Sequence, residues 1–390
     1  MNVDAGQSFN FLPLPTDVHF GCGCMTSLGN RLQAIGATRA LVVTDPGVRA
    51  AGIVDRVIGG LEQAGFQFAI YDNVTADSGS ELICQGVDAL KTNAADVVVG
   101  LGGGSALDTA KAVAALATNP GSPLDYLGLH RLRHRPIPIV AIPTTAGTGS
   151  EVSLWSVFTD DARALKVAIG SAWLYPAVAL CDPDLTLDLA RELTASTGMD
   201  ALAHAIECYT NNACQPISGA LALEAIALIG AHLRRAVSDG RDREARYAML
   251  VASTMAGMAM NPTRLGLAHA LAMPLGSWDL KIPHSIAIAV TLPEVMAFNS
   301  AARPDRFAAV ARALGERLEQ CSRDEAAALA SGAVRRLADD IGIPSSLSRF
   351  GLREDHVNAV VDEAMKSGNV TVNPRATTHE ELAGILRRVL

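Results

Sequence analysis

The first half of the chain alternates short apolar runs with longer stretches in which apolar residues recur at helical spacing. The apolar runs predict strands at 39–45, 67–74, 95–104 and 137–145. The stretches between them predict helices at 48–65, 80–93 and 106–118. Because strands and helices alternate, we expect βαβ units in a parallel sheet, which binds ligands at the carboxyl ends of its strands.

The pattern changes after residue 186, where strand-like runs nearly vanish and Ala- and Leu-rich helical periodicity takes over. We therefore expect two domains, an α/β domain over 1–186 and an all-helical domain over 187–390. Two capping boxes and one terminal glycine mark helix boundaries in the second domain. These signals are Ser322 with Glu325, Thr378 with Glu381, and Gly342.

The composition is that of a soluble globular enzyme with large cores, since 49% of the 390 residues are hydrophobic and 18% are charged. The net charge is −8 and the chain has no basic run, which argues against nucleic acid or an anionic membrane as a partner. No apolar stretch reaches the roughly 18 residues that a membrane span needs. The first residues also lack the pattern of a secretory signal.

The cysteines bear on the compartment in which the protein works. Seven are present, an odd number without a paired framework, which favours a reducing cytoplasm. Cys22 and Cys24 form a C-x-C pair that could indicate a metal site. No second pair follows them, and both lie in a glycine-rich turn, so we expect them to be structural.

A candidate phosphate-binding loop ends the third predicted strand, in VVVGLGGGSALDTAKAV. Gly102, Gly103 and Gly104 let backbone amides approach a ligand, and Ser105 begins a helix whose dipole suits a pyrophosphate. The loop is not a Walker A loop, because no Gly-Lys-Ser/Thr follows. It also differs from the usual dinucleotide fingerprint, because the acidic strand end, Asp45, precedes it. A tight strand-to-helix turn without a ligand remains the alternative.

A second loop rich in Gly and Thr, IPTTAGTGSEVS, ends the next predicted strand. Its Thr144, Thr145 and Thr148 offer hydroxyl donors, and its glycines permit close approach. Two such loops at the ends of successive strands predict opposite walls of one nucleotide cleft. Either loop alone could instead be a plain connector.

Residues 197–210, TGMDALAHAIECYT, place Asp200 and His204 one helical turn apart in an apolar helix. A buried carboxylate needs a partner, which could be the histidine itself or a metal ion. His269 and His284, both in apolar surroundings, would complete a set of four ligands, although either could be a hydrogen-bonded core histidine. One carboxylate and three imidazoles suit Fe²⁺ or Zn²⁺, and an open coordination position would make the ion a Lewis acid.

Several motifs follow one another along essentially the whole chain. They are FGCGCMTSLG, VVTDPG, GLGGGSALDTAKA, IPTTAGTGSEV, CDPDLT, TASTGMDALAHAIECY, GLAHALAMPLG, IPHSIAIAVTLP and NPR. In this order the chain resembles the iron-containing (group III) alcohol dehydrogenases. The resemblance implies a Rossmann-like dinucleotide-binding domain, an all-α domain and a dehydroquinate synthase-like architecture, with the site in the cleft between the domains. It also implies a homodimer.

The resemblance further implies two sets of site residues. The metal ligands would be Asp200, His204, His269 and His284. The pyrophosphate loop would contain Gly102, Gly103, Gly104, Ser105 and Asp108, and the dinucleotide would also be contacted by Thr144, Thr145 and Thr148.

Four other positions take their meaning from the resemblance. Asp45 would bind the adenosine ribose, and its charge should repel a 2′-phosphate, so NAD is favoured over NADP. Lys166 would lie near the nicotinamide ribose. Asp77 stands in the adenine region, where the family has Asn-Pro. Met273 stands where many members have a further histidine, so a proton relay through that position is missing.

We therefore expect reversible oxidation of a small alcohol to an aldehyde or ketone with NAD, in which Fe²⁺ or Zn²⁺ lowers the pKa of the substrate hydroxyl. Water or the ribose hydroxyls would carry the proton away. Three alternatives stay open. They are a polyol dehydrogenase or maleylacetate-type reductase on the same fold, a metal-dependent lyase that uses NAD transiently, and a nucleotide-binding protein without catalysis.

Overall fold

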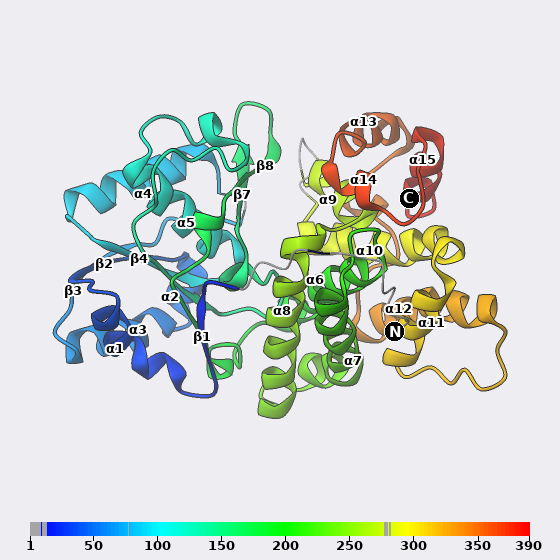
Figure 1. The fold of residues 1–390 in the computed structure, drawn as a ribbon, viewed down its shortest axis with the longest axis horizontal. Helices are drawn as coiled ribbons and strands as arrows, with labels where there is room; N and C mark the ends of the chain where they lie inside the picture. The colour runs from blue at the N-terminus through cyan, green and yellow to red at the C-terminus, as the bar shows by residue number, and fades with distance from the viewer. Residues whose placement is uncertain (1–8, 10–13, 77, 277–279, 281) are drawn as a thin grey trace. The chain divides into compact units, whose positions relative to one another are not determined.

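The computed structural model describes residues 9, 14–76, 78–276, 280 and 282–390. These residues form two compact units, one of which comprises Leu14–Leu189 and the other Ala190–Leu390. The first unit contains the sheets and the second is helical (Figure 1). The division lies near residue 186, where the hydrophobic pattern predicts a change of architecture.

Six parallel strands form the main sheet of the first unit. In order across the sheet they are β1 (Asp17–Phe20), β9 (Val178–Cys181), β6 (Ile139–Pro143), β4 (Val97–Gly102), β2 (Arg39–Val43) and β3 (Gln67–Tyr71). The register pairs Gly102 of β4 with Pro143 of β6. The two glycine-rich loops therefore leave neighbouring strands at the same carboxyl edge, as the sequence predicts.

Helices cover both faces of this sheet because its central strands are apolar on both sides. Ala40 and Val42 of β2 belong to a core cluster with α1 (Leu28–Ala34) and α3 (Ile53–Gln63). Leu41 and Val43 belong to the other cluster, with α4 (Ser80–Thr92) and α5 (Gly104–Thr118). α1 and α3 lie on one side of the sheet, and α4 and α5 lie on the other (Figure 1). Each such Val or Leu contributes roughly 1.5–3 kcal/mol by leaving water, so the strand is held in register from both sides.

The helix predicted over 48–65 is two helices, and a glycine separates them. Two residues separate α2 (Pro46–Ala50) from α3, and the second of them, Gly52, has a φ of 71°. A φ in this region is accessible to glycine at little cost, so the chain turns there instead of continuing the helix. Helical periodicity alone did not reveal this break.

A second, three-stranded sheet in this unit was not predicted from the sequence. Its strands, in order, are β5 (Gly128–Leu129), β8 (Leu165–Gly170) and β7 (Trp155–Asp160). The hairpin of β7 and β8 is antiparallel and pairs Thr159 with Lys166. The apolar pattern of β7 is interrupted by Ser156, Thr159 and Asp160, so its sequence does not predict a strand.

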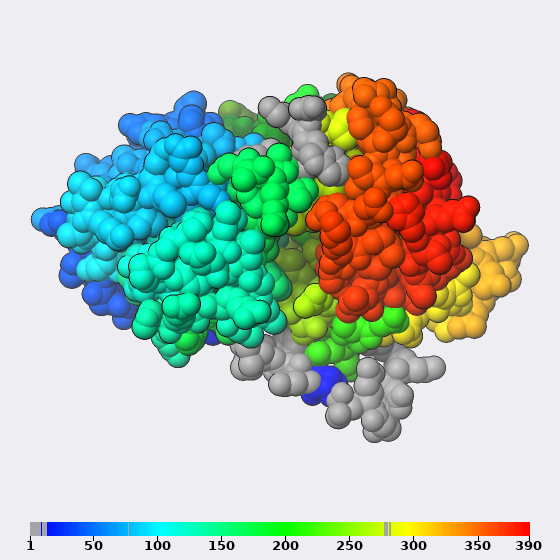
Figure 2. All heavy atoms as spheres, turned by 90° about the horizontal axis from the view of Figure 1, so that it is seen from above, coloured from blue at the N-terminus to red at the C-terminus, as the bar shows by residue number. Residues whose placement is uncertain are grey.

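The second unit is built from helices only in the part that the structure describes. They are α6 (Arg191–Thr210), α7 (Pro216–Ser238), α8 (Arg243–Thr263), α9 (Leu267–Leu275), α10 (His284–Asn299), α11 (Pro304–Ala313), α12 (Arg323–Ile341), α13 (Glu354–Ala364), α14 (Gly368–Val372) and α15 (His379–Arg387). α6 is buried along almost its whole length and packs against α7, α8 and α10. The last three helices form one continuous orange-to-red surface (Figure 2).

The predicted helix boundaries in this unit are confirmed. Ser322 with Glu325 and Thr378 with Glu381 form reciprocal capping boxes at the starts of α12 and α15. Gly342 ends α12 in the left-handed conformation, with a φ of 83°. These are the residues whose short polar side chains or missing Cβ suit helix ends.

Two helices of this unit are long and apolar enough to cross a membrane by length and composition. They are Pro216–Ser238, with a mean hydropathy of 1.5, and His284–Ala302, with 1.3. Both pack against α6, and 39% and 56% of their apolar windows are buried within the protein. Core helices of this kind pass the same test, so the length and hydropathy do not by themselves indicate a membrane protein.

Candidate metal centre and nucleotide-binding loops

The stretch 197–210 lies within α6, as predicted, and carries three polar side chains on one stripe of the helix. Asp200, His204 and Glu207 follow at intervals of four and three residues, the spacing that aligns side chains on one helix face. All three are buried, with exposed fractions of 3%, 6% and 4%. Burying a carboxylate or an imidazole costs free energy unless a partner compensates it, so this stripe must face other polar groups or an ion.

Two further imidazoles reach this stripe from other helices. His269 lies in the first turn of α9 and is buried, and His284 is the first residue of α10. His269 Nε2 lies 3.5 Å from Asp200 Oδ1, and His204 Nε2 lies 3.8 Å from the same oxygen. The rings of His269 and His284 meet edge to face with their centroids 5.9 Å apart. The structure thus brings together all four side chains that the sequence singled out.

The four are not equivalent in their geometry. The ligand atoms of Asp200, His269 and His284 all lie within 4.8 Å of one another, so these three form a group that could hold a metal ion. His204 adjoins the group and stacks on His269, with ring centroids 4.6 Å apart and an angle of 22° between the planes. Ligands of a tetrahedral ion bound at about 2.1 Å are roughly 3.4 Å apart. The distances of 3.5 and 3.8 Å to Asp200 are close to that value.

Two buried polar atoms of the group face each other, and a cation bound between them would satisfy both. Among the described residues, Asp200 Oδ1 and His269 Nε2 have no hydrogen-bond partner, although both atoms are buried. Leaving such atoms unsatisfied costs about 1–3 kcal/mol each, and more when the group is charged. An ion bound between them would remove this cost, so the donor set fits a divalent metal of the Fe²⁺ or Zn²⁺ kind.

The charges around the group favour an ionised Asp200. Burial alone would raise the pKa of its carboxyl, but the imidazoles of His204, His269 and His284 outweigh burial and lower it to about 2. Burial likewise opposes a charge on His269, yet Glu207 and Asp200 beside it raise its pKa to about 9. A metal ion would therefore compete with a proton for His269 at neutral pH.

Glu207 is the residue of this centre that sequence reasoning missed. Its Oε2 lies 2.6 Å from His269 Nδ1, the ring nitrogen that faces away from Asp200. Glu207 lies in the stretch 197–210, seven residues after Asp200. It could have been found in the sequence as a third polar residue on the same face of an apolar helix.

The glycines of the first loop lie in close contact with the second loop. Gly102 has a φ of 146°, and α5 begins two residues later at Gly104. A Cβ on Gly104 would stand 2.6 Å from Thr148 Cγ2, and one on Gly103 would stand 3.3 Å from Thr145 Cγ2. The two loops therefore touch, and the helix dipole of α5 points at their meeting place.

Asp45 lies at the same edge of the sheet. Its Oδ1 accepts a hydrogen bond from the Val48 amide at 3.0 Å and so caps α2. Its Oδ2 would lie 3.1 Å from a Cβ on Gly102, so the carboxylate stands beside the start of the glycine-rich loop. Ser105 Oγ donates to the carbonyl of Ala76 at 2.6 Å. Asp77, expected in the adenine region, lies outside the described residues.

Asp108 ties the two loops together. It lies one turn into α5, and its carboxylate accepts the hydroxyl of Ser150 at 2.6 Å and the Val157 amide at 3.1 Å. Burial raises the pKa of Asp108 and outweighs the opposing positive charges of Lys111 and Lys166. Lys166, on β8, therefore lies within electrostatic reach of the loop region.

Lys111 is a second residue that the sequence did not reveal. Its side chain is completely buried, and Nζ donates to Ser153 O, Ser153 Oγ and Trp155 O at 2.8–3.1 Å. It also lies 3.9 Å from Asp108. Burial lowers the pKa of Lys111 to about 8. The lysine holds the chain that follows the second loop against α5.

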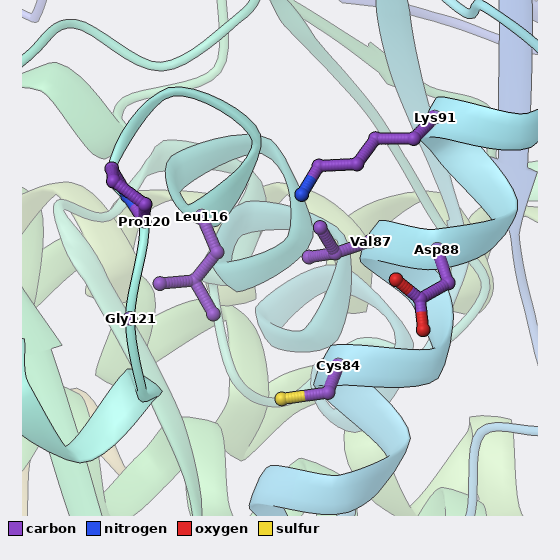
Figure 3. Close-up of a pocket in the computed structure, with 7 residues that line it drawn as sticks. All are labelled: Cys84, Val87, Asp88, Lys91, Leu116, Pro120 and Gly121. Carbon is purple, nitrogen blue, oxygen red and sulfur yellow. The ribbon is translucent and has the colours of Figure 1, made fainter.

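Two cavities among the described residues lie away from these side chains. One of about 180 Å³ is lined by α4, by Leu116 near the end of α5, and by Pro120 and Gly121 in the segment that follows (Figure 3). Leu116 is about 18 Å along the helix from the glycine-rich loop at 1.5 Å per residue. The other, of about 350 Å³, lies between the start of α6 and the end of α12. As the structure describes them, neither cavity is lined by a predicted site residue.

Comparison with known proteins identifies the class. Residues 15–183 match the family model for iron-containing alcohol dehydrogenases, and residues 194–390 match the model for the C-terminal part of that family. The NAD-dependent methanol dehydrogenase of Bacillus methanolicus is 38% identical over 381 residues, which are 98% of this chain and 100% of that protein. The 1,3-propanediol dehydrogenase of Klebsiella pneumoniae is 39% identical over 385 residues, 98% of this chain and 99% of that protein.

A solved structure agrees with these relatives. The crystal structure of a 1,3-propanediol oxidoreductase matches with a TM-score of 0.95 and 38% identity, over 98% of this chain and 100% of that one. The chain therefore belongs to the iron-containing alcohol dehydrogenase family and is an oxidoreductase. The predicted family and fold class are confirmed.

Proposed function

We propose that the protein interconverts a short-chain alcohol or diol and its aldehyde with NAD, using Fe²⁺ held by Asp200, His204, His269 and His284. The observation that carries the proposal is the pair of buried atoms, Asp200 Oδ1 and His269 Nε2, which face each other at 3.5 Å without hydrogen-bond partners among the described residues. A divalent ion at this place supplies a Lewis acid that lowers the pKa of the substrate hydroxyl.

The choice of NAD is supported by the loops at the carboxyl edge of the sheet. Gly102 to Ser105 lead into the N-terminus of α5, which suits a pyrophosphate, and Thr144, Thr145 and Thr148 lie on the adjoining loop. Asp45 beside Gly102 places a negative charge where a 2′-phosphate would be repelled. The name of the Bacillus methanolicus relative also supports NAD.

The chain's own residues have two tasks in this reaction. The loops orient the dinucleotide, and the acidic and imidazole side chains would hold the ion that binds the substrate oxygen. Met273 follows His269 by one helical turn and offers no proton-accepting nitrogen. The hydroxyl proton therefore leaves through water or the ribose hydroxyls. Lys166, near Asp108, is proposed to contact the nicotinamide ribose.

The substrate class rests on the relatives, whose names specify methanol and 1,3-propanediol. We also propose a homodimer, as the family resemblance implies. The cytoplasm is the proposed compartment, because the cysteines are odd in number and none of the seven forms a disulfide in the described residues, which supports a reducing environment.

The test is substrate profiling of anaerobically purified protein, with NAD or NADH and a panel of short alcohols, diols, aldehydes and keto acids. We expect net accumulation of NADH with short alcohols, and its loss after treatment with a chelator. Turnover without net NADH would instead indicate a lyase. Turnover that survives complete removal of metal would contradict the proposed role of the ion.

A further inference from the structure

We propose that Glu207 is a positioning residue of the metal centre, which sets the proton and the orientation of His269 and holds α9 against α6. The inference rests on the proposed function, since it concerns the centre assigned there. Three hydrogen bonds carry it. Glu207 Oε2 accepts from the Gly266 amide at 2.8 Å and contacts His269 Nδ1 at 2.6 Å, and Oε1 accepts from the Ala268 amide at 2.8 Å.

The first consequence concerns the tautomer of His269. A carboxylate accepts hydrogen bonds, so in the neutral form of His269, the form that can bind a metal, the proton lies on Nδ1. Nε2 then keeps its lone pair, and this nitrogen lies 3.5 Å from Asp200 Oδ1. A metal ion needs that lone pair, and carboxylates that hold a ligating histidine in this way also raise its basicity.

The second consequence concerns the position of α9. The first amides of a helix have no partner within the helix, and Gly266, which precedes α9, has no side chain to cap them. Glu207 supplies this cap from α6, where its charge also suits the positive end of the α9 dipole. Asp200 and His204 lie on the same stripe of α6 as Glu207. The carboxylate of Glu207 therefore fixes α9, which carries His269, relative to these two ligands.

Gly266 provides independent support, because its missing side chain makes room for this contact. A Cβ at this position would stand 2.8 Å from Glu207 Oε1 and 2.9 Å from Glu207 Cδ. Any other residue would have to push the carboxylate away. The glycine and the glutamate are thus complementary in shape, and both are needed for the cap.

The substitution Glu207→Gln tests whether the hydrogen bonds of Glu207 matter or only its volume, because glutamine has nearly the same size. If its amide oxygen occupies the place of Oε2, its NH₂ group meets the Ala268 N–H, and two donors face each other. If the oxygen occupies the place of Oε1, the NH₂ group meets the Gly266 N–H and His269 Nδ1. The imidazole must then carry its proton on Nε2, which blocks the lone pair that a metal requires.

The experiment measures the affinity of the full-length protein for Zn²⁺ by competition with a chelator, for the parent protein and for Glu207→Gln. We expect the dissociation constant to rise about 10- to 100-fold in the variant. Glu294→Gln is the matched control, since Glu294 is also a buried carboxylate of the helical unit but is bound by Arg335 and Arg388. Its Zn²⁺ affinity should stay at the parent value.

A second variant and a second readout keep the test decisive if Glu207→Gln folds poorly. Gly266→Ala keeps the carboxylate but displaces it, and it should weaken Zn²⁺ binding in the same direction. The visible spectrum of the Co²⁺-substituted protein should change in both variants, because the direction of the His269 lone pair changes. Parent-like affinity and spectrum in both variants would overturn the role of Glu207, whereas a parent protein that binds no Zn²⁺ would overturn the proposed metal centre itself.

Discussion

Asp200 Oδ1 and His269 Nε2 face each other at 3.5 Å across the interface of α6 and α9, and neither has a hydrogen-bond partner among the described residues. A simple ion pair would place these atoms within about 2.7–2.9 Å of each other, in line. Their separation is instead close to the roughly 3.4 Å between two ligands of one tetrahedral ion. The rest of the centre, including the stacked His204 and the contact of Glu207 with the far side of His269, is consistent with this arrangement.

The contact between the two loops predicts a defect in NAD binding for Gly104→Ala. The new Cβ would meet Thr148 Cγ2 at 2.6 Å, so the second loop must move away from the N-terminus of α5. We expect the KM for NAD to rise about tenfold or more, since displacements near 1 Å can cost up to 100-fold. Steady-state kinetics with NAD as the varied substrate measures this change.

Gly59→Ala is the control, because a Cβ at Gly59 in α3 meets no atom within 4 Å. It should leave the KM unchanged and stabilise the protein by about 0.5–1 kcal/mol. An unaltered KM in Gly104→Ala would show that the loops do not act on NAD together.

The charge of Asp45 predicts that Asp45→Asn accepts NADP more readily. Asparagine is an equally good N-cap, so α2 should persist while the repulsion of a 2′-phosphate is lost. The ratio of kcat/KM for NAD to that for NADP should fall at least about tenfold, or ~1.4 kcal/mol. If the ratio were the same in the variant, the adenosine ribose would have to lie elsewhere.

The burial of Lys111 predicts a large loss of stability for Lys111→Met. The substitution removes three hydrogen bonds and leaves the carboxylates of Asp108 and Glu151 without this cation. Breaking a buried ion pair by removing one partner costs about 3–5 kcal/mol. Urea unfolding of the variant measures the loss, and Lys91→Met on the exposed side of α4 should stay within about 0.5 kcal/mol of the parent protein. A loss below 1 kcal/mol at Lys111 would contradict its structural role.

The ion pairs of Glu294 with Arg335 and Arg388 predict that the stability of the protein depends on pH. Burial would raise the pKa of this carboxyl, but hydrogen bonds from Arg335 and Arg388 outweigh burial and lower it. A lowered pKa contributes stability that is present above the ordinary value, near 4.5, and lost as the pH falls through the folded value. Because both arginines are half exposed, we expect Glu294→Gln to cost about 1–2 kcal/mol at pH 7.

Denaturant unfolding of the parent protein and Glu294→Gln from pH 7 down to pH 4 checks the sign. The difference in free energy of unfolding should stay level at first and begin to shrink below about pH 4.5. A difference that grows as the pH falls would contradict the assignment.

Much of the site could be predicted because its residues differ in type from their neighbours in the sequence. Asp200 and His204 stand out in a helix that is otherwise apolar, and the three glycines at 102–104 stand out at the end of a strand. Capping boxes such as Ser322 with Glu325 are local and were confirmed, because both partners lie within one turn. Signals of this kind need no knowledge of the tertiary fold.

The remaining features depend on contacts between distant segments. Lys111 is an ordinary lysine in the sequence, and its burial follows from the position of β7, which was not predicted because Ser156 and Thr159 interrupt its apolar pattern. Glu207 could be noticed as polar, but its role depends on residue 266 of a different helix. The roles of these residues depend on which distant segments they contact in the fold, and a single sequence does not show those contacts.

The central claim is that four side chains from α6, α9 and α10 hold one divalent ion that the reaction requires. The most direct measurement is elemental analysis of anaerobically purified His269→Ala alongside the parent protein, with turnover and NAD affinity measured on the same samples. The account predicts about one ion per chain in the parent protein, almost none in the variant, no turnover in the variant, and an NAD affinity that is nearly unchanged. A His269→Ala protein that keeps its metal and oxidises alcohol at the parent rate would contradict it.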